Sequence, residues 1–90
     1  MSILIQIPVL SLGNQKKAQK FKVFEESVEL LKANTTEDKI NEAIDVIQAT
    51  IGYLRMFQSN DIYECSKKHN EKIIGRNWEL LGYIDLIQNF

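Results

Sequence analysis

Helix-breaking residues are scarce in this sequence, and this scarcity favours an α-helical fold. Its 90 residues include one proline and four glycines, whereas a small β fold needs turn residues at short intervals. Hydrophobic residues make up 44% of the chain, which is enough for a packed core and too many for a disordered chain. Because a chain of this length supports one small core, we expect a single all-α domain spanning residues 1–90.

The spacing of apolar residues predicts where the helices lie. Steps of three and four residues between apolar positions predict helices over 15–33, 37–57 and 61–74. A short extended arm is expected over 1–14 and an apolar tail over 77–90. The apolar stripe of the first helix consists of Phe21, Phe24, Val28 and Leu31, and that of the second consists of Ile40, Ile44, Ile47, Ile51 and Leu54.

Signals for helix ends accompany these periodic segments. Thr35 together with Asp38, or Thr36 alone, can cap the start of the second helix. Gly75 follows the third helix, at a position where a left-handed C-terminal cap is favourable. The short connection between the first two helices predicts that they pack as an antiparallel hairpin.

Charge is segregated along the chain, although the formal net charge is only −1. Residues 1–24 contain four lysines and no acid, whereas residues 25–45 contain seven acids and two lysines. The small net charge argues against a non-specific nucleic-acid binder, and the dispersed basic residues make a helical DNA-binding dimer a weaker alternative. The acidic block is therefore the feature that needs a functional explanation.

Two pairs of acids within this block are spaced to share helix faces. Glu26 and Glu29 are three residues apart, as are Glu42 and Asp45, so each pair points to one side of its own helix. In an antiparallel hairpin the four carboxylates can converge. The neighbours of the second pair on its helix are apolar or aromatic: Val46, Ala49, Tyr53 and Met56.

Converging carboxylates in apolar surroundings favour a metal site. Two like charges about 4 Å apart repel by roughly 4 kcal/mol at an effective dielectric constant of 20, and burying an unpaired carboxylate adds several kcal/mol. A hard divalent cation with oxygen ligands offsets this cost. We therefore expect Mg²⁺, with Mn²⁺ as the alternative. An ordinary solvated acidic face is the simpler explanation, and it suits Glu25 best.

The same acids spell a recognisable pattern. Glu25-Glu26-Ser27-Val28-Glu29 followed by Glu42-Ala43-Ile44-Asp45 has the form EExxE and ExxD. This pattern resembles the all-α nucleoside triphosphate pyrophosphohydrolase superfamily, which includes MazG-like proteins, dimeric dUTPases and phosphoribosyl-ATP pyrophosphohydrolases. Asn70, Lys72 and Arg76 have a spacing similar to that in the third helix of small MazG-like proteins. The resemblance covers about residues 15–78.

The resemblance implies Mg²⁺-dependent hydrolysis of a nucleotide between its α and β phosphates, which yields a nucleoside monophosphate and pyrophosphate. Glu25 would be a nearby acid that either supports the metal ligands or orients water, and it would belong to the catalytic set together with those ligands. Asn70 would contact phosphate or sugar. The implied metal ligands are Glu26, Glu29, Glu42 and Asp45, and the implied phosphate contacts are Lys22, Lys72 and Arg76.

Some of the implied site residues have simpler structural explanations, and so do four further residues that the sequence singles out. Lys72 and Arg76 suit a solvated helix C-terminus. His69 is expected at the edge of the core, because a magnesium site prefers oxygen ligands. Cys65 has no evident neighbouring base, and we expect it to be structural. Tyr53 and Trp78 are candidates for flanking a base or for apolar packing.

Three helices are too few to enclose the acidic face completely. The larger relatives close the bundle with an extra helix, so we expect a second copy of this chain to complete a four-helix-type bundle, in a homodimer or homotetramer. A non-catalytic helical interaction module that keeps the MazG-like fold is the alternative function. The residues do not identify the base or sugar, so dUTP, dCTP, non-standard nucleotides and phosphoribosyl-ATP are all candidate substrates.

The cellular setting follows from two simple features. A single cysteine allows no internal disulfide, which favours a reducing cytoplasm. No apolar run approaches the roughly 18 residues of a membrane span, so we expect no membrane partner.

Overall fold

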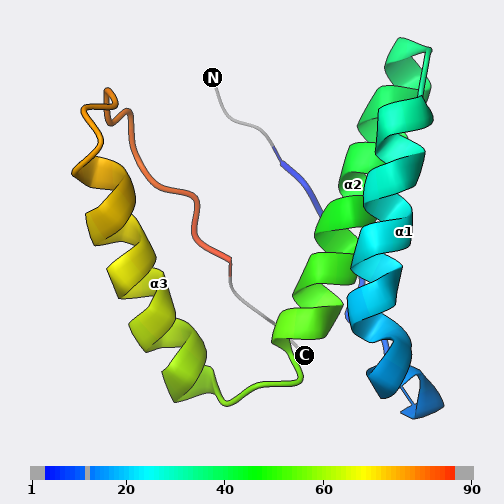
Figure 1. Cartoon of the computed structure of the whole chain (residues 1–90), viewed down its shortest axis with the longest axis horizontal. Helices are drawn as coiled ribbons and strands as arrows, with labels where there is room; N and C mark the ends of the chain where they lie inside the picture. The colour runs from blue at the N-terminus through cyan, green and yellow to red at the C-terminus, as the bar shows by residue number, and fades with distance from the viewer. Residues whose placement is uncertain (1–3, 12, 87–90) are drawn as a thin grey trace. The chain divides into compact units, whose positions relative to one another are not determined.

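The computed structural model describes residues 4–11 and 13–86. All regular secondary structure in these residues is helical, which confirms the predicted all-α class (Figure 1). The elements are a 3-10 helix, η1 (Gly13–Ala18), and three α-helices, α1 (Gln19–Lys32), α2 (Thr36–Leu54) and α3 (Ser59–Ile74).

The chain divides into two compact units, one ending at Met56 and the other beginning at Phe57. The first contains η1, α1 and α2, and the second contains α3 and the tail that follows it. Each unit is described by itself, and the prediction of one domain over residues 1–90 stays a prediction. The candidate metal ligands all belong to the first unit.

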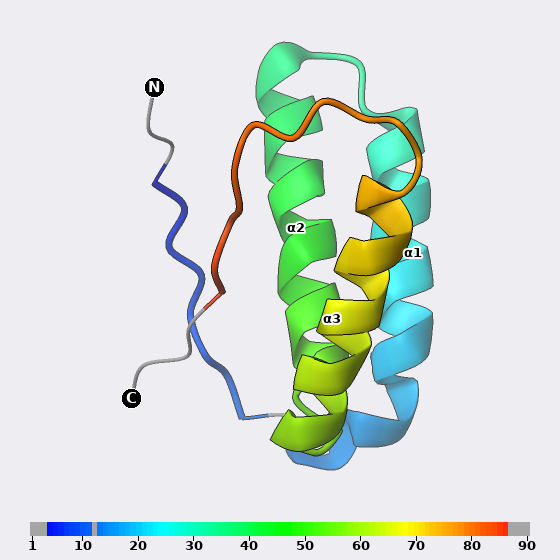
Figure 2. The ribbon, with the colours of Figure 1, turned by 90° about the vertical axis from the view of Figure 1, so that its left-hand side faces the viewer.

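The first unit is an antiparallel helical hairpin, in which α1 and α2 lie side by side (Figure 1, Figure 2). Residues 33–35 connect them. The Thr35 hydroxyl accepts a hydrogen bond of 3.0 Å from the backbone N–H of Asp38, which confirms Thr35 as the N-cap of α2. Glu37 and Asp38 lie in the first turn, where negative charge stabilises the helix dipole.

The hairpin buries only a narrow strip of each helix. Ala49 of α2 is 4% exposed and Gln19 of α1 is 8% exposed, and the Gln19 side-chain amide donates a hydrogen bond of 3.0 Å to the Ala49 carbonyl. On α1, half-buried positions recur at Val23, Glu26 and Leu30. An acidic side chain therefore lies on the same partly buried strip as apolar ones.

The apolar stripe of α1 lies mostly outside this strip. Phe21 is 69% exposed, Phe24 is 68% exposed and Leu31 is 86% exposed, whereas Val28 is half-buried. A hairpin offers each helix a single partner, so it covers one face and leaves the other open. Phe24 and Leu31 lie on the face that this unit leaves uncovered.

The N-terminal arm packs on α2 through polar contacts. The Gln48 side-chain amide donates to the Pro8 carbonyl at 3.0 Å, and the Arg55 guanidinium donates to the Leu10 carbonyl at 2.7 Å. Residues 4–10 have no regular secondary structure. The expected arm also covers residues 1–3 and 12, which lie outside the described residues, and it ends earlier than expected, because η1 begins at Gly13.

Several helix ends and one cap differ from the sequence-based expectation, and α3 begins at Ser59 rather than at residue 61. The first helix starts as η1 before continuing as α1, and α2 ends at Leu54 rather than at residue 57. Gly75 has φ −69°, in the right-handed region, so the predicted left-handed cap is wrong. Its backbone N–H donates instead to the Glu71 carbonyl at 3.1 Å, which continues the helical pattern into the cap and needs no positive φ.

The second unit consists of α3 and a tail without regular secondary structure over residues 75–86. None of the described residues of α3 is fully buried, and Leu81 and Ile84 of the tail are 89% and 90% exposed. In the part of the chain that the structure describes, no helix combines the length and the hydropathy required to cross a bilayer.

Candidate metal centre

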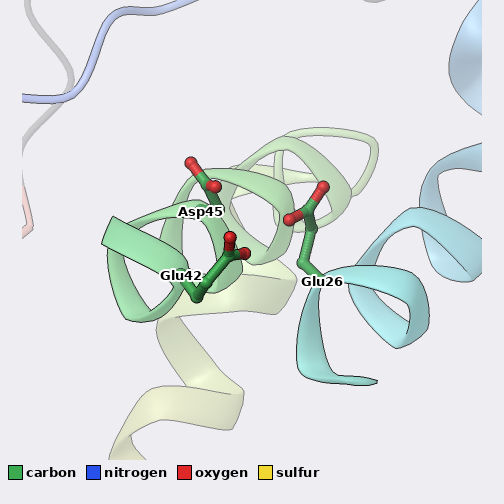
Figure 3. Close-up of side chains that lie close together, drawn as sticks. All are labelled: Glu26, Glu42 and Asp45. Atoms are coloured by element: carbon green, nitrogen blue, oxygen red, sulfur yellow. The ribbon is translucent and has the colours of Figure 1, made fainter. Parts of the chain in front are cut away.

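Three acidic side chains meet between the two helices of the hairpin. Glu26 extends from α1, and Glu42 and Asp45 extend from α2 (Figure 3). One carboxylate oxygen from each residue lies within 4.8 Å of the others. Glu26 and Glu42 are half-buried, whereas Asp45 is exposed. We call these three residues the carboxylate cluster.

The hairpin geometry explains why these acids converge. Glu42 and Asp45 are three residues apart on α2, so they project from one side of that helix. Glu26 lies on the partly buried strip of α1, and its side chain is only 16% exposed. Because α1 and α2 pack antiparallel, Glu26 lies next to Glu42 and Asp45, although these residues are well separated in the sequence.

Glu29, the fourth predicted ligand, does not belong to the carboxylate cluster. At about 100° per residue, it lies about 60° around α1 from Glu26, and it is exposed. Its negative charge still contributes to raising the pKa of Glu42. Glu29 is therefore close enough to act on the cluster electrostatically, and its role as a ligand stays a prediction.

The electrostatics of the carboxylate cluster penalise negative charge at Glu42. Burial raises the pKa of the Glu42 carboxyl above its ordinary value, and the charges of Asp45 and Glu26 raise it further. Lys22 offsets the charge of Glu26, because its ammonium lies 3.0 Å from a Glu26 carboxylate oxygen. The hydrogen bond to Glu26 raises the pKa of Lys22, so this cation is firmly charged at neutral pH.

The donor set suits a hard cation. All three groups are carboxylates, and the cluster contains neither histidine nor cysteine, which are the ligands that softer metals prefer. Mg²⁺ typically takes one or two protein carboxylates and keeps water or substrate phosphates in its other positions. The all-carboxylate donor set of Glu26, Glu42 and Asp45 is therefore chemically suited to a hard cation such as Mg²⁺.

The remaining predicted site residues fall into two groups. Lys22 and Glu25 are exposed on α1 and lie beside the cluster, where both line the same groove as Glu26 and Asp45. Asn70 and Lys72 of α3 and Arg76 after it belong to the second unit; Asn70 is half-buried and the two cations are exposed. Their contact with phosphate stays a prediction.

Several residues singled out in the sequence are more exposed than expected. His69 is exposed on α3, which differs from the expected position at the edge of the core. Cys65 is also exposed, and Trp78 is 72% exposed. Tyr53 is half-buried on α2.

A groove beside the carboxylate cluster was not apparent from the sequence. The N-terminal arm forms one wall, held by Gln48 and Arg55 of α2. Arg55 offered the best signal, because it is the sole charged residue between residues 46 and 60. An isolated arginine in an apolar helical segment usually has a specific partner, but the sequence does not reveal that the partner is a backbone carbonyl of the arm.

The chain matches no protein-family model, and comparisons with curated proteins and with solved structures give no match either. The functional assignment therefore rests on the EExxE and ExxD pattern and on the geometry of the hairpin.

Proposed function

We propose that this protein is a Mg²⁺-dependent nucleotide pyrophosphohydrolase, which cleaves a nucleoside triphosphate between its α and β phosphates. The observation that carries the proposal is the convergence of Glu26, Glu42 and Asp45 from two antiparallel helices, at the positions that the MazG-like pattern assigns to metal ligands. The half-buried placement of two of these acids favours a cation over an ordinary solvated face.

The proposed chemistry needs little beyond positioning and charge neutralisation. A bound Mg²⁺ would neutralise phosphate oxygens and lower the pKa of an attacking water. Glu25 is exposed beside the cluster and would accept the proton of that water. The water oxygen bonds to the α-phosphorus, the bond from this phosphorus to the bridging oxygen breaks, and pyrophosphate leaves.

Basic side chains would complete the phosphate site. Lys22 already pairs with Glu26 at 3.0 Å, so its ammonium lies at the edge of the carboxylate cluster, where a metal-bound phosphate would be held. The resemblance also assigns phosphate contacts to Lys72 and Arg76, and the guanidinium of Arg76 is suited to bidentate binding. Asn70 would bind phosphate or sugar.

We also propose that the active form is a homodimer or homotetramer. The hairpin leaves Phe24 and Leu31 on an uncovered apolar face, and a large exposed apolar patch is typical of an interaction surface. A second copy of the chain would cover this face and supply the wall that a single hairpin lacks.

Pyrophosphate release from canonical and deoxynucleoside triphosphates tests the proposal. We expect activity with Mg²⁺, its loss in EDTA, and a decrease of at least about 100-fold in Glu26→Gln, Glu42→Gln and Asp45→Asn, since metal affinity and activity depend strongly on each ligand. The matched control is Glu37→Gln, an exposed acid on α2 outside the carboxylate cluster. Activity that persists in all three cluster variants contradicts the proposal.

The alternative is a non-catalytic helical interaction module, and the exposed apolar residues of α1 and of the tail favour it. The two proposals differ in their response to ligand. A nucleotide and Mg²⁺ that bind the folded state raise its melting temperature. An unchanged melting temperature, together with no hydrolysis of any nucleotide, favours the interaction module.

A further inference from the structure

The groove next to the carboxylate cluster has a charged end and an apolar remainder. Glu26 and Asp45 line it, and so do Phe21 of α1 and Ile51 of α2. Its volume is about 600 Å³, within the roughly 300–1,000 Å³ typical of small-molecule sites. The groove therefore adjoins the candidate metal site directly.

The arm makes the groove a defined feature of the first unit. Val9 and Leu10 supply apolar surface on the arm side. The Arg55 guanidinium binds the Leu10 carbonyl at 2.7 Å, in a charge-assisted hydrogen bond that is stronger than a neutral one. A second bond, from Gln48 to the Pro8 carbonyl, fixes the arm at another point along α2.

Phe21 gives the groove an aromatic surface. Its side chain is 69% exposed and lines the groove, whereas Phe24, with 68% exposure on the same helix, does not line it. Lys22, which follows Phe21 directly, pairs with Glu26. The aromatic residue Phe21 is therefore adjacent in sequence to Lys22, the cation at the edge of the carboxylate cluster.

A ligand that fits this groove has a metal-binding polyanionic end and a flat, weakly polar end. A nucleoside triphosphate has both. We infer that the groove between the arm and the hairpin holds the nucleoside part of the substrate, with Phe21 as the surface on which the base stacks. This inference rests on the proposed function, and it identifies the part of the chain that contacts the base.

The inference is tested by comparing binding of two ligands in the presence of Mg²⁺. One is a non-hydrolysable nucleoside triphosphate, and the other is inorganic triphosphate, which has no base. Stacking of a base on an aromatic side chain contributes about 1–3 kcal/mol. Phe21→Ala should therefore weaken binding of the nucleotide by about 5- to 150-fold and leave the affinity for inorganic triphosphate unchanged.

Two further variants control for effects on folding and packing. Tyr63→Ala removes an exposed ring of α3 outside the groove and should leave the affinity for both ligands unchanged. Phe21→Trp keeps a stacking surface and should retain nucleotide affinity. Far-UV circular dichroism should show unchanged helix content in Phe21→Ala, because its exposed side chain contributes little to the packed strip.

The outcomes separate the inference from the proposed function. Nucleotide affinity and turnover that are equal in Phe21→Ala and wild type overturn the inference and leave the proposed function standing. The same holds if Phe21→Ala weakens binding of both ligands equally, or if Tyr63→Ala has the same effect on nucleotide binding. A wild-type protein that binds neither ligand with Mg²⁺ and hydrolyses no nucleotide overturns both.

Discussion

Glu42 carries its charge in surroundings that disfavour it. It is half-buried, and burial raises the pKa of its carboxyl, followed by the charges of Asp45 and Glu26. The folded state therefore binds a proton at Glu42 more tightly than the unfolded state does, and the contribution of Glu42 to stability decreases as pH rises. A bound cation reverses this penalty, because it favours the charged carboxylate.

This balance predicts the behaviour of Glu42→Gln. In EDTA at neutral pH, the variant should melt at a higher temperature than wild type, because the amide lacks the charge. The difference should disappear below pH 4.5, the ordinary pKa of the group, where the carboxyl is protonated in both folded and unfolded states. Thermal melts across this pH range measure the effect.

The same variant should lose the stabilisation by Mg²⁺ that we expect for wild type. Glu37→Gln, which changes an exposed acid in the first turn of α2, controls for charge removal as such. A melting temperature of Glu42→Gln below that of wild type in EDTA at neutral pH would contradict the electrostatic account.

At the scale of single elements, the start of α2 offers a direct test of the hairpin connection. The Thr35 hydroxyl accepts a hydrogen bond from the Asp38 N–H, so Thr35→Ala leaves that donor without its side-chain partner. We expect a loss of about 1 kcal/mol in the free energy of unfolding, the usual cost of removing such a cap. Urea denaturation measures this loss.

Thr36 provides the matched control for this prediction. It is the first residue of α2 rather than its N-cap, so Thr36→Ala should cost less than Thr35→Ala. A larger loss for Thr36→Ala would show that the helix starts elsewhere and would contradict the observed cap.

Local signals were enough to predict the helices and part of the site. The Thr35 cap and the three-residue spacing of Glu42 and Asp45 act within one helical turn, so the sequence displays them directly. Predicting that Glu42 and Asp45 lie next to Glu26 also required the expectation that the two helices form an antiparallel hairpin. The left-handed cap at Gly75 was a wrong prediction, because a glycine permits that conformation without requiring it.

The groove could not be predicted, because its contacts are distant in sequence. Gln48 donates to a carbonyl that is 40 residues away in the sequence, and Arg55 donates to a carbonyl that is 45 residues away. Periodicity within a helix carries no information about either hydrogen bond. The same limit applies to the exposure of Phe21 and Phe24. The apolar spacing identifies a stripe, but it does not reveal which face a single partner helix covers.

At the scale of the whole molecule, the uncovered apolar face predicts self-association. Leu31 is 86% exposed at the end of α1, and burying such a side chain contributes about 1.5–3 kcal/mol. We expect wild type to elute as a homodimer or homotetramer in size-exclusion chromatography with light scattering, and Leu31→Glu to shift it towards the monomer.

Asn34→Glu is the control for this experiment, since it introduces the same charge at a nearby exposed position without removing apolar surface. It should leave the oligomeric state unchanged. A monomeric wild-type protein at micromolar concentration would contradict the proposed assembly, and an equal effect of the two variants would point to charge rather than apolar contact.

In the proposed reaction, the carboxylate cluster supports attack of water on the α-phosphorus. The most direct measurement is product analysis by phosphorus NMR and mass spectrometry, after turnover of a nucleoside triphosphate with Mg²⁺ in water labelled with heavy oxygen. The account predicts pyrophosphate and a nucleoside monophosphate that carries the label, and no turnover by Asp45→Asn. A nucleoside diphosphate with labelled phosphate, or turnover that Asp45→Asn retains in full, would contradict it.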